Sequence, residues 1–277
     1  MKLGVISKGF LKRVLLALGV LAGIVVLCLI DGFLVEPYFP RVIRQDVCIE
    51  GLPKSLDGLK IVHLSDLHIV KYGKREARAE RLIGRIKPDL VCLTGDYVED
   101  DGITPGNHPW RKCAKESARF MSGLHGKYGV YAARGNWDPR EITPYLQKAG
   151  VRVLDGESVT LKIRGEKLRI AGNSSTIMST ASLPYSPLDD VTTIVLDHFP
   201  ESADDLANRT DVDLVLSGHW HGGQVGWPLK MTDVKYLAGF YRVGNLQLYV
   251  TRGLGMHTKA VRFDCPAEIT LIVLKAA

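Results

Sequence analysis

Apolar and polar positions repeat along this chain with two different periods. Short apolar runs rich in β-branched residues, such as 61–64, 90–94 and 214–217, predict buried strands, and apolar positions at helical spacing predict helices between them. The pattern predicts strands over 59–65, 89–94, 128–133, 151–154, 158–163, 167–172, 191–197, 212–217, 234–239, 246–251 and 268–274. It predicts helices over 75–87, 109–123, 140–149 and 200–208.

The order of these elements indicates the fold class. Strands and helices alternate early and strands dominate late, which is typical of an α/β fold with two sheets packed face to face and helices outside. Hydrophobic residues make up 46% and charged residues 24% of the 277 residues, as in ordinary globular domains. We expect one catalytic domain over 59–277. The segment 99–109, with two glycines and a proline before Pro109, is the best candidate for a lid or an insertion.

The N-terminal region has a different composition. The uncharged run VLLALGVLAGIVVLCLI covers 14–30 and just reaches the lower limit for crossing a membrane. We therefore expect a basic N-terminus over 1–13, a membrane anchor helix over 14–33, and a linker and lead-in over 34–58. No small-x-small cleavage site precedes Pro37, which favours a retained anchor over a removed signal peptide. We expect the cell (inner) membrane as the location.

The orientation of this anchor has two interpretations. Lys2, Lys8, Lys12 and Arg13 precede the run and outnumber Arg41 and Arg44 after it, so the positive-inside rule places the catalytic domain outside the cytoplasm. Alternatively, the short segment 14–33 enters one leaflet and returns, with Asp31 and Gly32 at the break, which keeps the domain cytoplasmic. The side of the catalytic domain stays open at this point.

Polar side chains follow the predicted strands at the points where they end. Asp66, Asp96 and His219 each come directly after an apolar run. The carboxyl ends of strands in open α/β sheets are where ligands bind, so distant residues can meet there. The motifs supply seven metal donors in all: Asp66, His68, Asp96, Asn136, His198, His219 and His221. Carboxylate, amide and imidazole donors in this number suit two divalent ions that each keep a position open.

Each motif alone is weak evidence. Asp-x-His and His-x-His pairs often occur by chance, and a strand histidine is commonly a hydrogen-bonded core residue. His63 illustrates that ordinary outcome because it lies within an apolar run, before the turn that carries Asp66. The donors lie in five motifs, at 66–68, 95–96, 135–138, 197–198 and 218–221, and the joint order of these motifs is what favours a dinuclear hydrolase site.

The joint pattern resembles the calcineurin-like metallophosphoesterases, and within them the small bacterial membrane-associated phosphodiesterases. The resemblance covers about 59–273 and includes Gly222-Gly223-Gln224 and the segment 249–255. It implies a four-layer α-β-β-α sandwich. It also implies that Asp66, His68 and His221 bind the first ion, that Asp96 bridges both ions, and that Asn136, His198 and His219 bind the second.

The sequence departs from this family at Trp137. Most members have a histidine after the motif asparagine, and that histidine is assigned to contact or protonate the leaving group. An indole N–H donates one hydrogen bond but supplies no proton near neutral pH. Trp137 therefore favours substrates with good leaving groups, such as a nucleotide monophosphate expelled from a pyrophosphate. The alternative is that Trp137 packs beside the second metal.

The ligand types also bear on the metal and on phosphate binding. Two cations activate water and neutralise charge on the phosphoryl group. Imidazole donors favour Mn, Fe or Zn over Mg, and we expect Mn. Arg252 is a candidate clamp for the phosphate, although a surface arginine on a terminal loop is equally common. We list Asp96, Asn136, Trp137 and Arg252 as the candidate catalytic residues.

Charge and cysteine content narrow the partners. The net charge of +6 suits a protein that rests on anionic lipid. Basic residues are scattered rather than interleaved with aromatic residues, so we expect no nucleic acid partner. The segment 235–242 mixes apolar and basic residues and is a candidate for contact with lipid, or an ordinary half-buried strand. Five cysteines without C-x-x-C spacing indicate neither a disulfide framework nor a cysteine metal site.

Together these features lead to three functional hypotheses. The first is a membrane-anchored phosphodiesterase or pyrophosphatase that acts on a lipid-linked or nucleotide-linked phosphate, with UDP-2,3-diacylglucosamine in lipid A synthesis as one substrate to consider. The second is a broad phosphodiesterase with another substrate. The third, motivated by Trp137, is a catalytically weakened metal-binding scaffold or regulator at the membrane.

Overall fold

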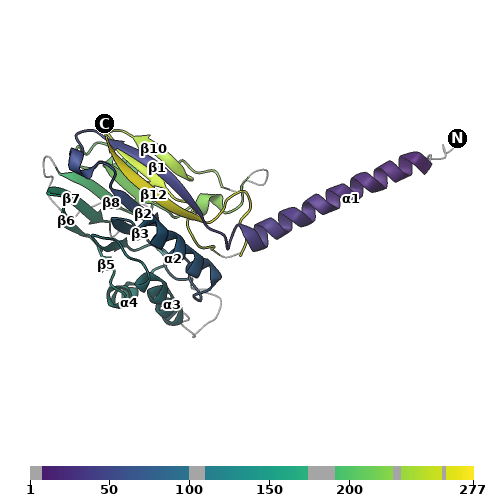
Figure 1. Cartoon of the computed structure of the whole chain (residues 1–277), viewed down its shortest axis with the longest axis horizontal. Coiled ribbons are helices and arrows are strands. Elements are labelled where there is room, and N and C mark those ends of the chain that lie inside the picture. The colour runs from purple at the N-terminus through teal and green to yellow at the C-terminus, as the bar shows by residue number, and fades with distance from the viewer. Residues whose placement is uncertain (1–7, 100–109, 174–190, 227–231, 258–259) are drawn as a thin grey trace.

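Two six-stranded sheets form the centre of the molecule (Figure 1). The computed structural model describes residues 8–99, 110–173, 191–226, 232–257 and 260–277. The first sheet has the order β1 (Arg41–Ile49), β12 (Glu268–Ala276), β2 (Lys60–Leu64), β3 (Leu90–Thr94), β4 (Val130–Ala133) and β5 (Arg152–Val153). The second has the order β10 (Gly239–Val243), β11 (Leu246–Val250), β9 (Leu214–Ser217), β8 (Thr192–Leu196), β7 (Glu166–Gly172) and β6 (Glu157–Ile163).

Helices cover the outer faces of both sheets. The first sheet carries α2 (Lys74–Ile86), α3 (Trp110–Ser122) and α4 (Thr143–Lys148), and the second carries the short α5 (Ser202–Leu206). Single 3₁₀ turns lie at Lys54–Leu56, Arg140–Ile142 and His221–Gly223. The layers therefore run helix, sheet, sheet, helix, which confirms the predicted four-layer α/β sandwich.

Successive side chains of the central strands point to opposite faces of the sheet, and both faces are covered. In β2, Val62 and Leu64 face the helices, whereas Ile61 faces the second sheet. In β3, Leu93 faces the helices and Cys92 faces the second sheet. A strand covered on both faces needs a continuous apolar run rather than an alternating one, and this is the pattern that the sequence shows.

The structure corrects two predicted segments. The linker expected over 34–58 contains β1, which pairs in parallel with β12 from Arg41↔Glu268 to Ile49↔Ala276 and so forms the edge of the first sheet. The strand expected over 234–239 is absent there. β10 begins instead at Gly239 and forms a hairpin with β11 that pairs Phe240 with Tyr249. The lid predicted over 99–109 lies outside the described residues apart from Glu99.

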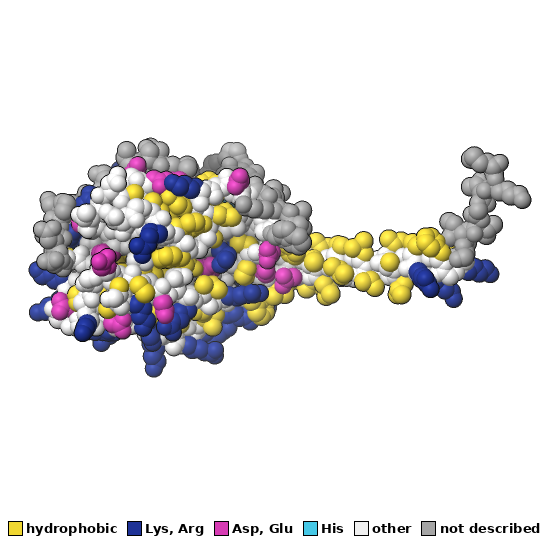
Figure 2. Space-filling view, turned by 90° about the horizontal axis from the view of Figure 1, so that it is seen from above, with side chains coloured by type: hydrophobic (Ala, Val, Ile, Leu, Met, Phe, Trp, Pro, Cys, Tyr) yellow, Lys and Arg dark blue, Asp and Glu magenta, His cyan; other side chains and the backbone are white. Residues whose placement is uncertain are grey.

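The apolar N-terminal run forms a single long helix, α1 (Lys8–Ile30), which projects from the domain (Figure 1). It continues through a π-helical turn at Asp31–Val35 rather than breaking at Asp31 and Gly32 as the re-entrant alternative requires. Hydrophobic side chains cover the described length of this helix between its basic N-terminal end and the domain (Figure 2). By length and composition, Lys8–Val35 can cross a membrane.

Asp138 ties together the loops that follow β3 and β4. Its Oδ2 accepts hydrogen bonds from the backbone N–H groups of Asp96 at 2.8 Å and Gly135 at 2.9 Å. Its Oδ1 accepts one from the N–H of Tyr97 at 2.8 Å. The Asp138 side chain is buried. Among the described contacts, no other group accepts a hydrogen bond from these three N–H groups, which lie away from water.

We predict that Asp138→Ala lowers the free energy of unfolding by about 3 kcal/mol or more, because a buried N–H left unpaired costs roughly 1–3 kcal/mol. The measurement is urea unfolding of the full chain in a nonionic detergent. Glu141→Ala is the control, since Glu141 is exposed on the next turn. A loss no larger than that of the control would contradict the assigned role.

Candidate metal centre

The predicted donors come from the carboxyl ends of parallel strands in both sheets. Asp66 follows β2, Asp96 follows β3, and these neighbouring strands are parallel. His198 follows β8 and His219 follows β9, which are also parallel neighbours. The strand ends of the two facing sheets meet here, because the His219 N–H donates to both carboxylate oxygens of Asp66, at 3.0 and 3.2 Å. The architecture thus brings together side chains more than 150 positions apart, as in the pair Asp66 and His219.

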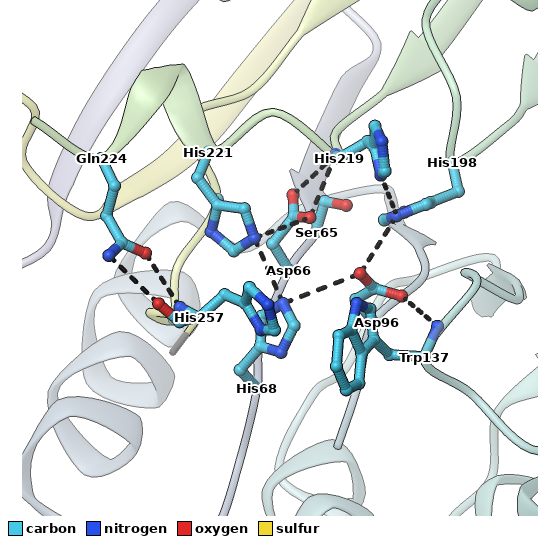
Figure 3. Close-up of polar contacts among 12 residues, drawn as sticks. Ser65, Asp66, His68, Asp96, Trp137, His198, His219, His221, Gln224 and His257 are labelled. Carbon is cyan, nitrogen blue, oxygen red and sulfur yellow. Dashed lines mark hydrogen bonds and ion pairs between the residues drawn. The ribbon is translucent and has the colours of Figure 1, made fainter. Parts of the chain in front are cut away.

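Asp66, His68 and His221 form one cluster of converging donor atoms. The Nε2 atoms of His68 and His221 lie 3.2 Å apart, and His221 Nε2 lies 3.5 Å from Asp66 Oδ1 (Figure 3). All three residues are buried. This is the set that the family resemblance implies for the first ion.

Asp96, His198 and His219 form a second cluster beside the first. His198 Nε2 lies 3.1 Å from Asp96 Oδ2 and 3.2 Å from His219 Nδ1 (Figure 3). Asp96 Oδ2 also lies 3.7 Å from His68 Nε2 of the first cluster. One carboxylate oxygen therefore approaches ligands of both groups, which is the position that a bridging residue needs.

The backbone around these donors is strained. Five of them, Asp66, His68, Asp96, His219 and His221, have positive φ angles between 40° and 74°. This left-handed region is uncommon for residues other than glycine, and such residues cluster at functional sites. The conformation aims each side chain back over the strand end instead of along the next loop.

Two glycines allow the loops to approach the carboxylates closely. A Cβ atom at Gly135 would lie 2.2 Å from Asp96 Oδ1, and one at Gly218 would lie 2.3 Å from Asp66 Oδ2. Any side chain at either position would collide with a donor. The glycines in these motifs are therefore required by the packing of the site.

Opposing charges set the protonation of the cluster. Burial raises the pKa of the Asp96 carboxyl, but the neighbouring His198 outweighs this effect and lowers the pKa to about 2. Burial lowers the pKa of His198, but the Asp96 carboxylate raises it to about 10. Burial and the charge of His198 lower the pKa of His219 to about 4. Burial, reinforced by the charge of Asp96, raises the pKa of Asp138 to about 7.

Polar contacts orient two of the imidazoles. His198 Nδ1 lies 2.7 Å from the Thr94 carbonyl oxygen, so Nδ1 donates and Nε2 faces Asp96 and the centre, where a bound metal would take the place of its proton. On the other cluster, His68 Nδ1 lies 2.6 Å from Glu99 Oε2, a contact of ion-pair length that leaves Nε2 facing His221. Each of these histidines therefore presents the same nitrogen to the centre.

Two residues near the site, Glu99 and His257, were not predicted as site residues from the sequence, and a third, Gln224, was named only within the family resemblance. Glu99 and His257 form a further group with His68, and Gln224 holds the His257 backbone through bonds of 2.8 and 3.2 Å (Figure 3). The His257 ring lies 4.5 Å from the Trp137 ring, between centroids. The sequence offered one signal for Glu99, namely an acidic residue three positions after the predicted ligand Asp96. His257 lies in an irregular loop with no pattern to mark it.

The remaining candidates lie at the margin of the cluster. Asn136 is exposed. The backbone N–H of the next residue, Trp137, donates to Asp96 Oδ1 at 3.0 Å. Trp137 is 36% exposed and lines a cavity of about 340 Å³ together with Asp96, His219 and His221.

Arg252 pairs with the buried Glu268 at 2.8 Å, so contact with a phosphate competes with this ion pair. His63 Nε2 bonds with Thr94 Oγ1 at 2.8 Å, in the core.

The donor set fits a pair of divalent cations. Two buried carboxylates share one pocket with four imidazoles, and the facing ring nitrogens at 3.2 Å can form a hydrogen bond in only some tautomers. Cations satisfy carboxylate charge and imidazole lone pairs together. Asp66, His68 and His221 would hold one ion, and Asp96, His198 and His219 would hold the other.

Comparisons with known proteins agree with this geometry. The chain is 29% identical to the uncharacterized metallophosphoesterase YkuE of Bacillus subtilis (strain 168), over 87% of each chain. It is 28% identical to the phosphodiesterase YaeI of Escherichia coli (strain K12), over 78% of this chain and 82% of that protein. It is also 28% identical to a transmembrane protein with a metallophosphoesterase domain from Danio rerio, over 98% of this chain and 65% of that protein.

The family model described as calcineurin-like phosphoesterase matches residues 59–223, which contain all seven predicted donors. This family depends on two metal ions, in agreement with the paired clusters. The chain therefore belongs to the calcineurin-like phosphoesterases and is a metal-dependent hydrolase of phosphoric esters.

Proposed function

We propose that this protein is a membrane-anchored phosphodiesterase or phosphoanhydride hydrolase that acts on a lipid-linked or nucleotide-linked phosphate. The observation that carries the proposal is the pair of donor clusters joined through Asp96 Oδ2. Two divalent cations, Mn in our proposal, would supply the positive charge and the activated water for attack on phosphorus. The relative from Escherichia coli carries the name phosphodiesterase, which supports a diester substrate.

The chain contributes position and shape to this reaction. Strained loops and the Asp138 hydrogen bonds hold the donors rigidly, so the substrate phosphate meets a fixed arrangement of charge. The cavity lined by Trp137, His219 and Gln224 provides the space for the group attached to that phosphate. In this proposal Asn136 completes the second donor set from the edge of the same loop, and Arg252 stays a candidate contact for the phosphate.

Trp137 sets the kind of bond that is cut most readily. Its side chain stands at the mouth of the centre and has no transferable proton at neutral pH. A leaving group of low pKa departs without protonation, which favours phosphoanhydrides and activated diesters. UDP-2,3-diacylglucosamine has such a bond, and it remains one specific substrate to test.

The proposal places α1 in the membrane. Beyond its basic first turns this helix is apolar on all sides, and it has no buried residue among those described. The relative from Danio rerio carries the name transmembrane protein and aligns with nearly the whole chain, α1 included. A tethered catalytic domain meets lipid substrates at high local concentration.

A catalytically weakened scaffold is the competing interpretation, and Trp137 is its only specific support. It predicts metal binding without turnover. The two predictions below therefore separate the interpretations, because they measure hydrolysis and its dependence on named side chains.

We predict that Asp96→Asn lowers kcat for bis(p-nitrophenyl) phosphate by about 1,000-fold or more, since removal of charge that stabilises a phosphoryl transition state typically costs on the order of 4 kcal/mol. The assay uses the Mn-loaded full chain in detergent, and a chelator should abolish the wild-type activity. Asp204→Asn is the control, because Asp204 pairs with Lys235 at the surface, away from the centre. Turnover retained in Asp96→Asn would contradict the bridging position.

We predict that Trp137→His increases hydrolysis of a diphenyl phosphate relative to bis(p-nitrophenyl) phosphate by about 10-fold or more, since a positioned general acid contributes roughly 10²–10⁴ where the leaving group is poor. Trp137→Phe is the control that keeps an aromatic ring without a proton donor. The same factor on both substrates would show that the indole does not determine the leaving-group preference.

A further inference from the structure

The junction between α1 and the catalytic domain is held by specific contacts. The Gly32 carbonyl accepts the Arg262 N–H at 2.9 Å, and the Glu36 carboxylate accepts the Cys265 N–H at 3.0 Å. On the other side, Arg78 of α2 donates to the Tyr38 carbonyl at 3.0 Å and stacks on the Phe39 ring at 3.6 Å. The base of α1 is therefore fixed against both α2 and the loop before β12.

A cavity of about 740 Å³ opens at this junction. Leu34, Tyr38 and Phe39 form its apolar side, beside the end of the membrane segment, and Leu34 and Phe39 are 61% and 49% exposed. Lys74, Arg78 and Arg81 of α2 form its basic side. Apolar surface thus lies directly against clustered positive charge.

The basic side of this cavity has little charge compensation from the protein. Among the described ion pairs, none joins Lys74 or Arg81 to a carboxylate, and both side chains are exposed. The nearest acidic residue of α2 at this end, Glu76, is instead occupied by Arg75 at 2.6 Å and by the Gly73 N–H. The cavity therefore offers cations that an external anion can pair with.

A second cavity, of about 360 Å³, lies between the junction and the metal centre. It shares Tyr38 and Lys74 with the first cavity and reaches His68 and Glu99. Glu99 is in contact with His68 and His257, so its charge is offset locally. Lys74 thus lines both cavities, and the second cavity extends to His68 at the edge of the donor cluster.

We propose that the junction cavity binds the headgroup of an anionic phospholipid, with the lipid phosphate on Lys74 and Arg81 and the acyl chains along Leu34 and Phe39. A lipid fits better than a soluble anion, because the apolar side is contiguous with a helix long enough to cross a membrane. The inference rests on the membrane anchoring in the proposed function and deepens it. It makes an anionic amphiphile the substrate class and the second cavity the path of its phosphate to the metals.

The test measures lipid binding directly. The full chain in nonionic detergent is titrated with dioleoyl phosphatidylglycerol or dioleoyl phosphatidylcholine, and native mass spectrometry gives the dissociation constant for the first bound lipid. We expect at least about fivefold tighter binding of phosphatidylglycerol. The variant Lys74→Glu/Arg81→Glu should reduce this preference to below about twofold. If circular dichroism shows that this charge-reversed variant does not fold, the variant Lys74→Gln/Arg81→Gln is used in its place, with the same expected result.

The matched control is Arg85→Glu/Lys112→Glu, which reverses two exposed charges on α2 and α3 outside both cavities. It should keep the wild-type lipid preference. Equal binding of the two lipids by the wild type, or a preference that survives in the cavity variant, would overturn the proposal. Because the readout is binding, an absence of diester hydrolysis would count against the proposed function alone and would leave this result standing.

Discussion

Two buried carboxylates in one pocket are the constraint around which this molecule is organised. Asp66 and Asp96 are almost inaccessible to solvent, and uncompensated charges there would be very costly. Four imidazoles surround them, and the opposite pKa shifts of Asp96 and His198 indicate that positive charge is favoured beside Asp96, whereas burial raises the pKa of Asp66. Divalent cations provide that positive charge and supply the chemistry of phosphoester hydrolysis at the same place.

The rest of the fold holds this pocket in shape. Parallel strands from two sheets end on the same side, left-handed backbone at five donors turns the side chains inward, and Asp138 joins the loops after β3 and β4. The strained loops and their hydrogen bonds would not be stable without the packed sheets beneath them. The buried layers between and outside the sheets provide the stability that the strained loops need.

Much of the site could be predicted from the sequence because its donors directly follow apolar runs. Asp66, Asp96 and His219 are marked by the strands before them, and strand ends in such sheets converge. Glu99 and His257 were missed because they lie in irregular segments, where contact depends on tertiary structure. β1 was missed because it is a half-exposed edge strand whose partner, β12, lies more than 200 positions away. The start of β10 was misplaced because it depends on pairing with β11, whose register is set by the turn between Val243 and Leu246.

The most direct test of the account is the anomalous scattering of crystals of the Mn-loaded protein, recorded at the manganese edge. The account predicts two peaks about 3.5–4 Å apart. One should lie among Asp66, His68 and His221, the other among Asp96, His198 and His219, with Asp96 Oδ2 in contact with both. A single peak, or a second peak that Asp96 does not touch, would contradict it.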